Sequence, residues 1–472
     1  MTHTTDYASR TIIILGGGPG GYEAALVASS LGAQVTLIER QGFGGSAVLT
    51  DVVPSKTLIA SADIMASLDE TADLGICFSE EKTTGKPYVD LKTVNERLLR
   101  LAQQQSADIK RSLERAGVTI IEGTGKLKDQ YTVEVRESNG LSYELRAEFI
   151  LLAVGTHPRE LPTAKPDGER ILNWTQLYSL KELPEELIVV GSGVTGAEFA
   201  SAYNRLGSHV TLISSRDRVL PGEDEDAAEV LENVFDRRGV KVIPRSRAQA
   251  VNYSEDGTKV IVSLADGRKV QGTHCLIAVG SIPNTENLGL ENAGVKTTQS
   301  GHIIVDKVSR TNISSIYAAG DCTGVYPLAS VAAMQGRVAM AHMMGDAVKP
   351  LRTHQVAANI FTSPEIATVG ITEKEIAQGT YRADTIMLSL STNPRAKMMA
   401  VKDGFIKIFS RQHSGTVLGG VVVGPRASEL IFPLALAVDK KLHVDDLAET
   451  FTVYPSLTGS ISEAARKLHK AL

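Results

Sequence analysis

Two stretches of the chain repeat one pattern of apolar and small residues. Thr11–Leu15 and Leu187–Val190 are short β-branched runs, and each leads into a glycine-rich turn. A stretch with helical spacing follows each turn, reaching Leu31 in the first case and about Leu206 in the second. This order predicts two strand–turn–helix units, each the start of a doubly wound sheet.

The last part of the chain has a different pattern. Apolar runs at Ile386–Leu390, Phe405–Phe409 and Val417–Val423 are followed by helical stretches, which predicts a mixed sheet with helices on one face. Ser460 and Glu463 have the spacing of a capping box, which predicts a closing helix. The expected fold class is α/β, with two Rossmann-like, doubly wound nucleotide-binding domains and a C-terminal α+β domain.

Both glycine-rich turns have the GxGxxG spacing. Such glycines permit a tight turn and let backbone approach a pyrophosphate, whose charge faces the helix N-terminus. One GxGxxG is weak evidence, but two in the correct strand-to-helix context indicate two dinucleotide sites. The first turn supplies Gly16, Gly18, Pro19, Gly20 and Gly21, and the second supplies Gly191, Ser192, Gly193, Val194 and Thr195.

The residues that end the second strands distinguish the two sites. Glu39 lies 39 − 21 = 18 positions after Gly21, and Ser214 lies 214 − 196 = 18 positions after Gly196. A carboxylate at this place accepts hydrogen bonds from the adenosine ribose hydroxyls. Glu39 therefore suits FAD or NAD at the first site.

At the second site the carboxylate is replaced by Ser214, and Ser215, Arg216 and Arg218 follow. Arginines at this place favour a ribose 2'-phosphate, and so NADPH over NADH. Gly196 argues against this preference, and arginines after a strand are often only solvated. The choice between NADPH and NADH stays open.

Composition limits the class of protein. A chain of 472 residues predicts about three domains. Its net charge of -5 gives no basic patch for nucleic acid and no polybasic segment for membranes. The apolar runs are shorter than the roughly 20 residues that span a bilayer, and the polar start lacks a secretory signal. We expect a cytoplasmic protein without integral membrane association.

The chain has three cysteines, Cys77, Cys275 and Cys322. They are isolated in sequence and have neither CxxC nor metal-ligand spacing. We expect buried free thiols and no metal site.

Beyond the two turns, residues 44–56 read GGSAVLTDVVPSK, which resembles the redox-active segment of the flavoprotein disulfide reductases. Further matches to this family extend over most of the chain: Ala153–Pro158, Ala278–Pro283, Thr311–Asp321, Phe361–Ala367, Asn393–Lys397 and Val423–Pro425. The resemblance implies an FAD domain of residues 1–161 and 288–348, an inserted NAD(P) domain of residues 162–287, and an interface domain of residues 349–472 that forms a homodimer.

The resemblance also implies the residues of both cofactor sites. The FAD site comprises Gly16, Gly18, Pro19, Gly20, Gly21, Glu39, Arg40, Gly44, Gly45, Ser46, Lys56, Gly125, Ala153, Gly155, Gly320, Asp321, Leu328 and Ala329. The NAD(P) site comprises Gly191, Ser192, Gly193, Val194, Thr195, Glu198, Ser214, Ser215, Arg216, Arg218 and Gly280.

The chain departs from the family at the groups that reduce disulfides. Ala47 and Val52 stand where the family has its two cysteines, and neither side chain can form a thiolate. Tyr454 and Gly459 stand where the family has a histidine and a glutamate that act as the acid–base pair. All four groups of disulfide exchange are thus replaced, which argues against a disulfide reductase.

The family's lysine and glutamate beside the flavin are kept, as Lys56 and Glu198. A cation there stabilises negative charge on reduced flavin. A structural ion pair is the alternative interpretation. We expect hydride from NAD(P)H still to reach the flavin.

The electrons must then pass to a small acceptor that diffuses in. Val48, Leu49, Val52 and Val53 would present an apolar face suited to a quinone, although such residues also serve ordinary packing. Tyr454 either hydrogen-bonds the quinone or packs at the dimer interface. The chain resembles the cysteine-free lipoamide-dehydrogenase-like NAD(P)H:quinone reductases of actinobacteria. A transhydrogenase or diaphorase and a catalytically silent FAD-binding subunit remain alternatives.

Overall fold

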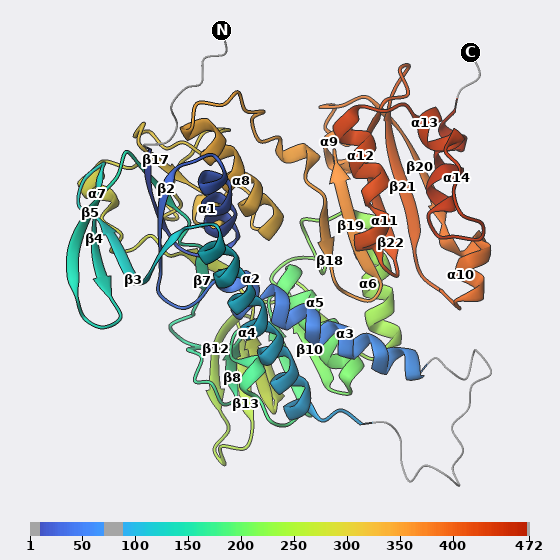
Figure 1. The fold of residues 1–472 in the computed structure, drawn as a ribbon. Helices are drawn as coiled ribbons and strands as arrows, with labels where there is room; N and C mark the ends of the chain where they lie inside the picture. The colour runs from blue at the N-terminus through green and yellow to red at the C-terminus, as the bar shows by residue number, and fades with distance from the viewer. Residues whose placement is uncertain (1–9, 70–87, 470–472) are drawn as a thin grey trace. The chain divides into compact units, whose positions relative to one another are not determined.

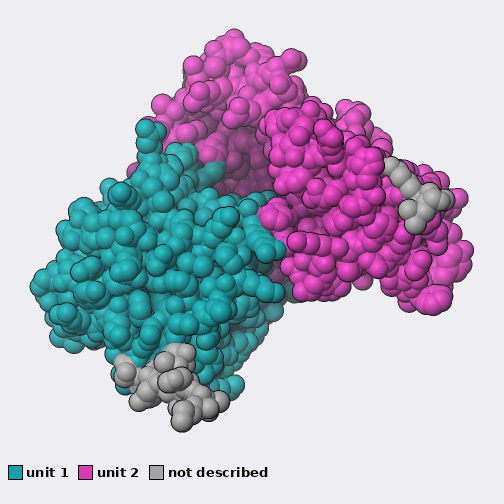
Figure 2. All heavy atoms as spheres, turned by 90° about the horizontal axis from the view of Figure 1, so that it is seen from above, with its two compact units in different colours: residues 1–55, 96–159, 280–353 teal, residues 56–95, 160–279, 354–472 magenta. Residues whose placement is uncertain are grey.

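The computed structural model describes residues 10–69 and 88–469, and these fall into two compact units (Figures 1 and 2). Unit 1 comprises Met1–Ser55, Glu96–Arg159 and Gly280–Thr353, and unit 2 comprises Lys56–Asn95, Glu160–Val279 and His354–Leu472. Two helices, α3 (Val52–Asp69) and α4 (Leu91–Arg115), contribute residues to both units. The predictions for the N-terminal residues and for Cys77 lie outside the described ranges, and the three-domain boundaries stay a prediction.

Unit 1 is built on a seven-stranded sheet with the order β17-β6-β1-β2-β3-β4-β5. The five strands from β17 to β3 are parallel, and β3, β4 and β5 form an antiparallel extension. Its strands and helices are β1 (Thr11–Leu15), α1 (Pro19–Ser30), β2 (Gln34–Glu39), α2 (Gly45–Leu49), β3 (Thr119–Leu127), β4 (Thr132–Glu137), β5 (Ser142–Arg146), β6 (Phe149–Leu152), β7 (Thr156–Pro158), β16 (Ser281–Pro283), α7 (Leu290–Ala293), β17 (Ile316–Ala318) and α8 (Ala329–Met343).

Alternation along β1 places the core on both faces of this sheet. Ile12 and Ile14 pack on one side with residues of α1 and α8, and Ile13 and Leu15 pack on the other. Burial on both faces is typical of parallel strands in doubly wound sheets, which explains the continuous apolar run of β1. The predicted strand and helix are confirmed.

Two glycines show why the first turn needs its spacing. Gly16 has φ +102°, and a Cβ there would lie 2.3 Å from the Ala153 carbonyl oxygen. A Cβ on Gly21 would lie 1.9 Å from the Gly16 carbonyl oxygen. Any side chain at either position would force α1 away from the ends of β1 and β6.

Unit 2 contains a second parallel sheet, with the order β11-β10-β9-β15-β8, and a three-stranded antiparallel sheet, β12-β13-β14. Its first β–α–β unit repeats that of unit 1, as the pattern predicted. The elements are β8 (Ile171–Asn173), β9 (Glu186–Val190), α5 (Val194–Leu206), β10 (His209–Ile213), α6 (Glu225–Arg237), β11 (Lys241–Ile243), β12 (Ala248–Tyr253), β13 (Val260–Leu264), β14 (Lys269–Gly272) and β15 (His274–Ile277).

The C-terminal part of unit 2 is a five-stranded sheet with the order β18-β19-β22-β21-β20. All four strand pairings are antiparallel, so the prediction of a mixed sheet was wrong. The apolar runs reveal strands but not their directions, which the connections decide. The elements are β18 (Ala358–Ile360), β19 (Glu365–Gly370), α9 (Glu373–Ala377), β20 (Ala383–Ser389), α10 (Pro394–Met398), β21 (Phe405–Arg411), β22 (Val417–Gly424), α11 (Ala427–Leu430), α12 (Phe432–Lys440), α13 (Val444–Glu449) and α14 (Gly459–Leu468).

The closing helix α14 is present, but its predicted cap is not. Thr458 occupies the N-cap position and makes no capping hydrogen bond with its side chain. Ser460 is buried, and its Oγ accepts a hydrogen bond of 2.7 Å from Asn393 Nδ2. The Gly459 N–H is bound instead by Ser456 Oγ at 3.1 Å. Tertiary contacts therefore replaced the local capping box.

Among the described residues, the helices are too short or too polar to cross a membrane.

Candidate functional site

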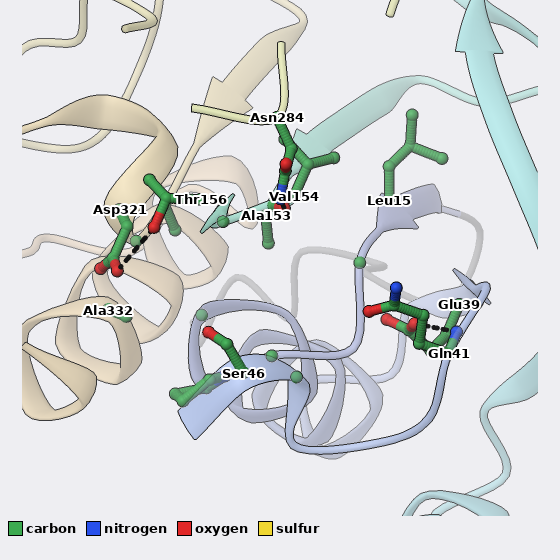
Figure 3. Close-up of a pocket in the computed structure, with 18 of the residues that line it drawn as sticks. Leu15, Glu39, Gln41, Ser46, Ala153, Val154, Thr156, Asn284, Asp321 and Ala332 are labelled. Atoms are coloured by element: carbon green, nitrogen blue, oxygen red, sulfur yellow. Dashed lines mark hydrogen bonds between the residues drawn. The ribbon is translucent and has the colours of Figure 1, made fainter. Parts of the chain in front are cut away.

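Unit 1 contains a cavity of about 440 Å³ at the C-terminal ends of its parallel strands (Figure 3). This is where ligands bind in doubly wound sheets, and the volume lies in the range of cofactor sites. Fourteen of the predicted FAD residues line it: Gly16, Gly18, Pro19, Gly20, Glu39, Arg40, Gly45, Ser46, Gly125, Ala153, Gly155, Gly320, Asp321 and Ala329.

Four predicted FAD residues are not in the wall of this cavity. Gly21 packs α1 onto the turn, and the Gly44 N–H donates to the Gly17 carbonyl at 2.8 Å. Leu328 is the N-cap of α8, and Lys56 lies on α3 in unit 2. Gly21 and Gly44 therefore support the backbone of the glycine-rich turn without lining the cavity.

The wall also includes residues that the sequence analysis missed. Asn284, Asn287 and Thr124 come from loops and a strand far apart in the sequence, and no periodicity marks them. Asn284 is fixed by a 2.9 Å hydrogen bond from its Nδ2 to the Val154 carbonyl. Thr156 lies within the Ala153–Pro158 turn, which is the one signal that could have revealed it.

Glu39 sits at one end of the cavity and is held by backbone amides (Figure 3). Its Oε2 accepts from Gly17 N at 2.6 Å, and its Oε1 accepts from Gln41 N at 2.6 Å and Gly42 N at 3.2 Å. A carboxylate has about four acceptor sites, so these bonds fix its orientation and leave capacity for a ribose hydroxyl.

Asp321 lies at the opposite end of the cavity in the same view (Figure 3). Its Oδ2 accepts a long hydrogen bond of 3.4 Å from Thr156 Oγ1. Burial raises the pKa of this carboxyl above its ordinary value. A half-buried carboxylate with such a weak partner is suited to accept hydrogen bonds from a ligand's hydroxyl groups.

The cavity therefore fits FAD on its own geometry. Between the two carboxylates, α1 begins at Pro19, and its N-cap Gly18 has no side chain to cap the first turn, so the positive end of the helix is open to a diphosphate. Backbone approaches backbone here, because a Cβ on Gly45 would lie 2.8 Å from Gly18 Cα. Glu39 and Asp321 are placed to hold the hydroxyl groups on either side.

The two residues predicted to stand at the family's cysteine positions both face this cavity. Ala47 and Val52 are part of its wall, and Val52 is 37% exposed. Val48 differs from the prediction, since it is only 7% exposed and belongs to the core beneath the sheet. Val53 packs against the same core, so only part of the predicted apolar face meets the cavity.

Neither described cysteine can replace the missing pair. Cys275 and Cys322 are free and buried, as predicted. Burial raises the pKa of the Cys322 thiol to about 12, and it also raises that of Cys275. Both stay protonated at neutral pH and are unreactive.

Lys56 and Glu198 form an ion pair within unit 2. Lys56 Nζ donates to Glu198 Oε2 at 2.7 Å, and the Glu198 side chain is 6% exposed. Lys56 lies one turn after Val52 on the same helix, α3. The structure therefore brings these two predicted residues together, 142 positions apart in sequence.

The second GxGxxG turn lies between β9 and α5. Gly191 has φ +115°, and a Cβ on it would lie 2.1 Å from the Ala278 carbonyl oxygen. A Cβ on Gly193, the N-cap of α5, meets open space. Val194 is 42% exposed and Thr195 is half-buried at the start of the helix, which suits a site open to a ligand. Gly280, with φ +95°, belongs to unit 1.

The end of β10 carries the residues proposed for nucleotide choice. Ser214 is fully buried, and its Oγ lies 2.7 Å from Ser192 Oγ, so its hydroxyl ties the strand to the turn. Ser215 and Arg216 are exposed. Arg218 contacts Glu225 at 3.4 Å across the start of α6.

One further arginine joins this edge. The Arg245 N–H donates to the Arg216 carbonyl at 2.9 Å, and the Arg245 side chain is 78% exposed. Arg245 was not predicted because it follows β11, beyond the motif, and parallel pairing of β10 with β11 brings it here.

Tyr454 lies on the surface of unit 2, where its side chain is 83% exposed. The neighbouring Phe451 and Val453 are 102% and 79% exposed. Such a group of exposed apolar side chains is typical of a protein–protein interface.

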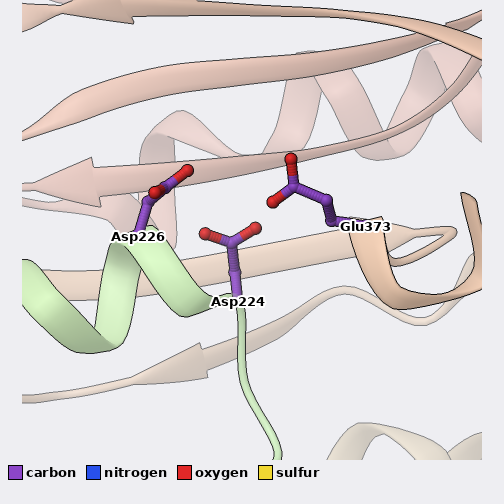
Figure 4. A group of neighbouring side chains, drawn as sticks. All are labelled: Asp224, Asp226 and Glu373. Atoms are coloured by element: carbon purple, nitrogen blue, oxygen red, sulfur yellow. The ribbon is translucent and has the colours of Figure 1, made fainter. Parts of the chain in front are cut away.

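A group of three carboxylates was not predicted. Asp224, Asp226 and Glu373 converge from the start of α6 and the start of α9 (Figure 4). Lys407 Nζ lies among them, at 2.8, 2.5 and 2.9 Å respectively. Burial alone lowers the pKa of Lys407, but its hydrogen bonds to these carboxylates outweigh it, and the pKa lies above its ordinary value. The lysine serves as the group's cation.

Comparison with known proteins agrees with this geometry. Residues 10–336 match the family model described as pyridine nucleotide-disulphide oxidoreductase, and residues 356–465 match the dimerisation domain of the same family. A Mycobacterium tuberculosis protein named NAD(P)H dehydrogenase (quinone) is 51% identical over 468 residues, covering 97% of this chain and 93% of the relative. A dihydrolipoyl dehydrogenase of Zymomonas mobilis is 32% identical over 458 residues, covering 96% of each.

The crystal structure of LpdA from Mycobacterium tuberculosis superimposes with a TM-score of 0.93 at 50% identity, covering 98% of this chain and 100% of that chain. The α/β fold class predicted from the sequence is confirmed. The predicted cofactors, FAD and NAD(P)H, are those of the matched family. The chain belongs to the pyridine nucleotide-disulphide oxidoreductase family.

Proposed function

We propose that this protein is an FAD-dependent NAD(P)H oxidoreductase that passes two electrons to a diffusible quinone. The observation that carries the proposal is the cavity wall, where Ala47 and Val52 occupy the two positions at which the disulfide reductases have cysteine. The relative that is 51% identical bears the name NAD(P)H dehydrogenase (quinone), which supports the same acceptor.

The proposed reaction is NAD(P)H + H⁺ + quinone giving NAD(P)⁺ and hydroquinone. FAD, when bound, accepts a hydride and releases two electrons to the second substrate. Glu39 and Asp321 would hold the cofactor at its hydroxyl groups, and the uncapped start of α1 would hold the diphosphate. Lys56, paired with Glu198, supplies a positive charge that favours the reduced cofactor.

We infer that disulfide exchange has no route through the residues of this site that the structure describes. Ala47 and Val52 offer no thiolate, and the thiols of Cys275 and Cys322 are buried. We further infer that Tyr454 and Gly459 remove the acid–base pair that disulfide reduction needs. Electrons must therefore leave directly to a small acceptor.

NADPH is the proposed reductant, because Ser214 stands where a ribose-binding carboxylate would end β10 and three arginines follow in the chain. Asp217 lies between two of them and contacts the third, Arg245, at 3.9 Å. Arg216, Arg218 and Arg245 gather at the ends of β10 and β11, where the 2'-phosphate of a bound nucleotide would lie. We also propose a cytoplasmic homodimer that binds no nucleic acid, joined through the exposed apolar residues of the C-terminal sheet region.

Anaerobic mixing of the FAD-loaded protein with NADPH tests the proposal. The flavin absorbance should bleach, and it should return rapidly when a benzoquinone or naphthoquinone is added. The reduced protein should show no long-wavelength thiolate-to-flavin charge-transfer band, because no cysteine is among the described residues that line the cavity.

Each alternative gives a different result. No bleaching with either NADPH or NADH indicates a catalytically silent FAD-binding subunit. Bleaching that is reversed only by an oxidised nucleotide analogue indicates a transhydrogenase. Reduction of a disulfide substrate at a rate comparable to the quinone would refute the proposed acceptor.

A further inference from the structure

The short segment between β18 and β19 forms two hydrogen bonds with helix α5. The Phe361 N–H donates to Glu198 Oε1 at 2.8 Å, and the Ser363 N–H donates to Ser201 Oγ at 3.2 Å. Glu198 and Ser201 are three residues apart, so they lie on one face of the helix. The segment is braced internally by Thr362, 2% exposed, whose Oγ1 donates to the Pro364 carbonyl at 2.7 Å.

Phe361 also contacts the other member of the ion pair. Lys56 Nζ lies 4.9 Å from the centroid of the Phe361 ring, within the range of a cation–π interaction. One residue therefore binds the carboxylate through its main chain and the ammonium through its ring. No motif predicted this contact, because the three residues come from α3, α5 and the end of β18.

An ion pair this deeply placed needs such support. Glu198 is 6% exposed and Lys56 25% exposed, so both charges have lost much of their hydration. The mutual attraction of a buried pair offsets this loss only when further hydrogen bonds satisfy each partner. The Phe361 amide binds the oxygen of Glu198 that Lys56 leaves free, and the ring covers a face of the ammonium.

We propose that Phe361 is a positioning residue, whose main-chain N–H and ring hold the Lys56–Glu198 pair in the arrangement that stabilises reduced FAD. The proposal rests on the function proposed above. It is supported within the chain by α3, on which Val52 lines the FAD cavity and Lys56 follows one turn later. Phe361 itself touches neither substrate nor cofactor in this role.

Replacement of the ring tests the proposal, because the main-chain bond remains. In Phe361→Leu, apolar bulk is kept and the cation–π contact is lost. The flavin midpoint potential, measured by dye equilibration, should become more negative, since Lys56 is held less firmly. Reduction of the flavin by NADPH in single-turnover mixing should slow by about 3- to 30-fold, the range expected for one cation–π contact. Phe361→Tyr keeps the ring and should stay near wild type in both.

Lys56→Met calibrates the measurement. It should shift the potential in the same direction as Phe361→Leu and by more. An unchanged potential in Phe361→Leu, beside a shifted one in Lys56→Met, would overturn the role of Phe361. An unchanged potential in Lys56→Met as well would overturn both that role and the proposed action of Lys56 on the flavin.

The identity of the electron acceptor is tested separately from the role of Phe361. If the potentials shift as expected but quinones do not reoxidise wild-type protein, the proposed function fails and the inference about Phe361 stands. Melting temperature and FAD content are measured for every variant. Should Phe361→Leu lose FAD, Phe361→Met takes its place in the same comparison, with the same expected shift.

Discussion

Ala47 and Val52 differ from cysteine by little in size and by everything in redox chemistry. Both face the cavity that we assign to FAD, so at the predicted cysteine positions the wall offers methyl groups and no thiol. Asp321, in contrast, is a carboxyl group at a position where burial disfavours its charged form. Under the proposed function, single residues therefore determine both which acceptor is possible and how the cofactor is held.

Asp321→Asn should make the FAD-free protein more stable at neutral pH. A carboxyl whose pKa is raised on folding binds its proton more tightly in the folded state, so its contribution to stability is lost as pH rises through the folded pKa. The amide carries no charge to desolvate. The melting temperature of Asp321→Asn minus that of wild type should therefore increase from about pH 4 to pH 7.

The same variant should bind FAD at least about tenfold more weakly, because a charged acceptor is lost. Ser46→Ala, an exposed position in the same wall, is the matched control and should leave the pH dependence of stability unchanged. A melting-temperature difference that stays flat with pH would contradict the role of the buried charge.

Arg216→Ala combined with Arg218→Ala should raise KM for NADPH by about 10- to 100-fold and change KM for NADH by less than about threefold, since only NADPH carries the phosphate. Steady-state quinone reduction with each nucleotide gives both values. Arg411→Ala, an exposed arginine at the end of β21, is the control. Equal losses with both nucleotides would refute recognition of the phosphate.

Among the secondary-structure elements, α6 is notable for the number of ion pairs made by the carboxylates at its start. Its N-cap, Asp224, accepts from Ala227 N and also binds Lys407, so one carboxylate both starts the helix and ties it to β21. Lys407 is 1% exposed on the face of β21 opposite to Ile406 and Ile408, which belong to the core under α12 and α14. The same helix start contributes Glu225, which contacts Arg218.

Lys407→Met should destabilise the fold by about 3–5 kcal/mol, because it leaves neighbouring carboxylates without their cation. Urea and thermal unfolding measure the loss. Lys440→Met removes an exposed pair with Asp439 and should cost less than about 1 kcal/mol. If Lys407→Met and Lys440→Met have the same free energy of unfolding, the ion pairs of Lys407 contribute no more to stability than a surface ion pair.

The sequence predicted these elements unevenly. The strand and helix of each GxGxxG unit were correct because glycine spacing and β-branched runs act locally. The capping box at Ser460 was wrong because Asn393, 67 residues away, binds that hydroxyl. Fourteen residues predicted from motifs to bind FAD line one cavity, whereas Asn284, Asn287 and Thr124 reach it only through folding.

The whole molecule presents apolar side chains that a single chain does not cover. Phe432 and Phe451, in unit 2, are 67% and 102% exposed. They lie in the segment that matches the dimerisation domain of the family, residues 356–465. Large exposed aromatic residues are costly in water and are typical of the centre of an interface.

Phe432→Glu combined with Phe451→Glu should weaken self-association by at least about tenfold, since each places a charge where a second copy would bury an aromatic ring. Sedimentation velocity across a concentration series measures it. Tyr88→Glu, a described tyrosine of unit 2 that is 86% exposed and outside the dimerisation segment, is the control and should leave association unchanged. A wild-type protein that stays monomeric at micromolar concentration would contradict the proposed homodimer.

The sequence alone determined the family resemblance and the two nucleotide turns, and it predicted the replacement of the redox cysteines, because each is written in contiguous residues whose spacing carries the chemistry. Tertiary structure decided what surrounds those residues. The amide and ring of Phe361 on the Lys56–Glu198 pair, Arg245 beside Arg216, and Lys407 among three carboxylates each join residues from separate elements. Such contacts depend on how strands and helices pack, and no local pattern records them.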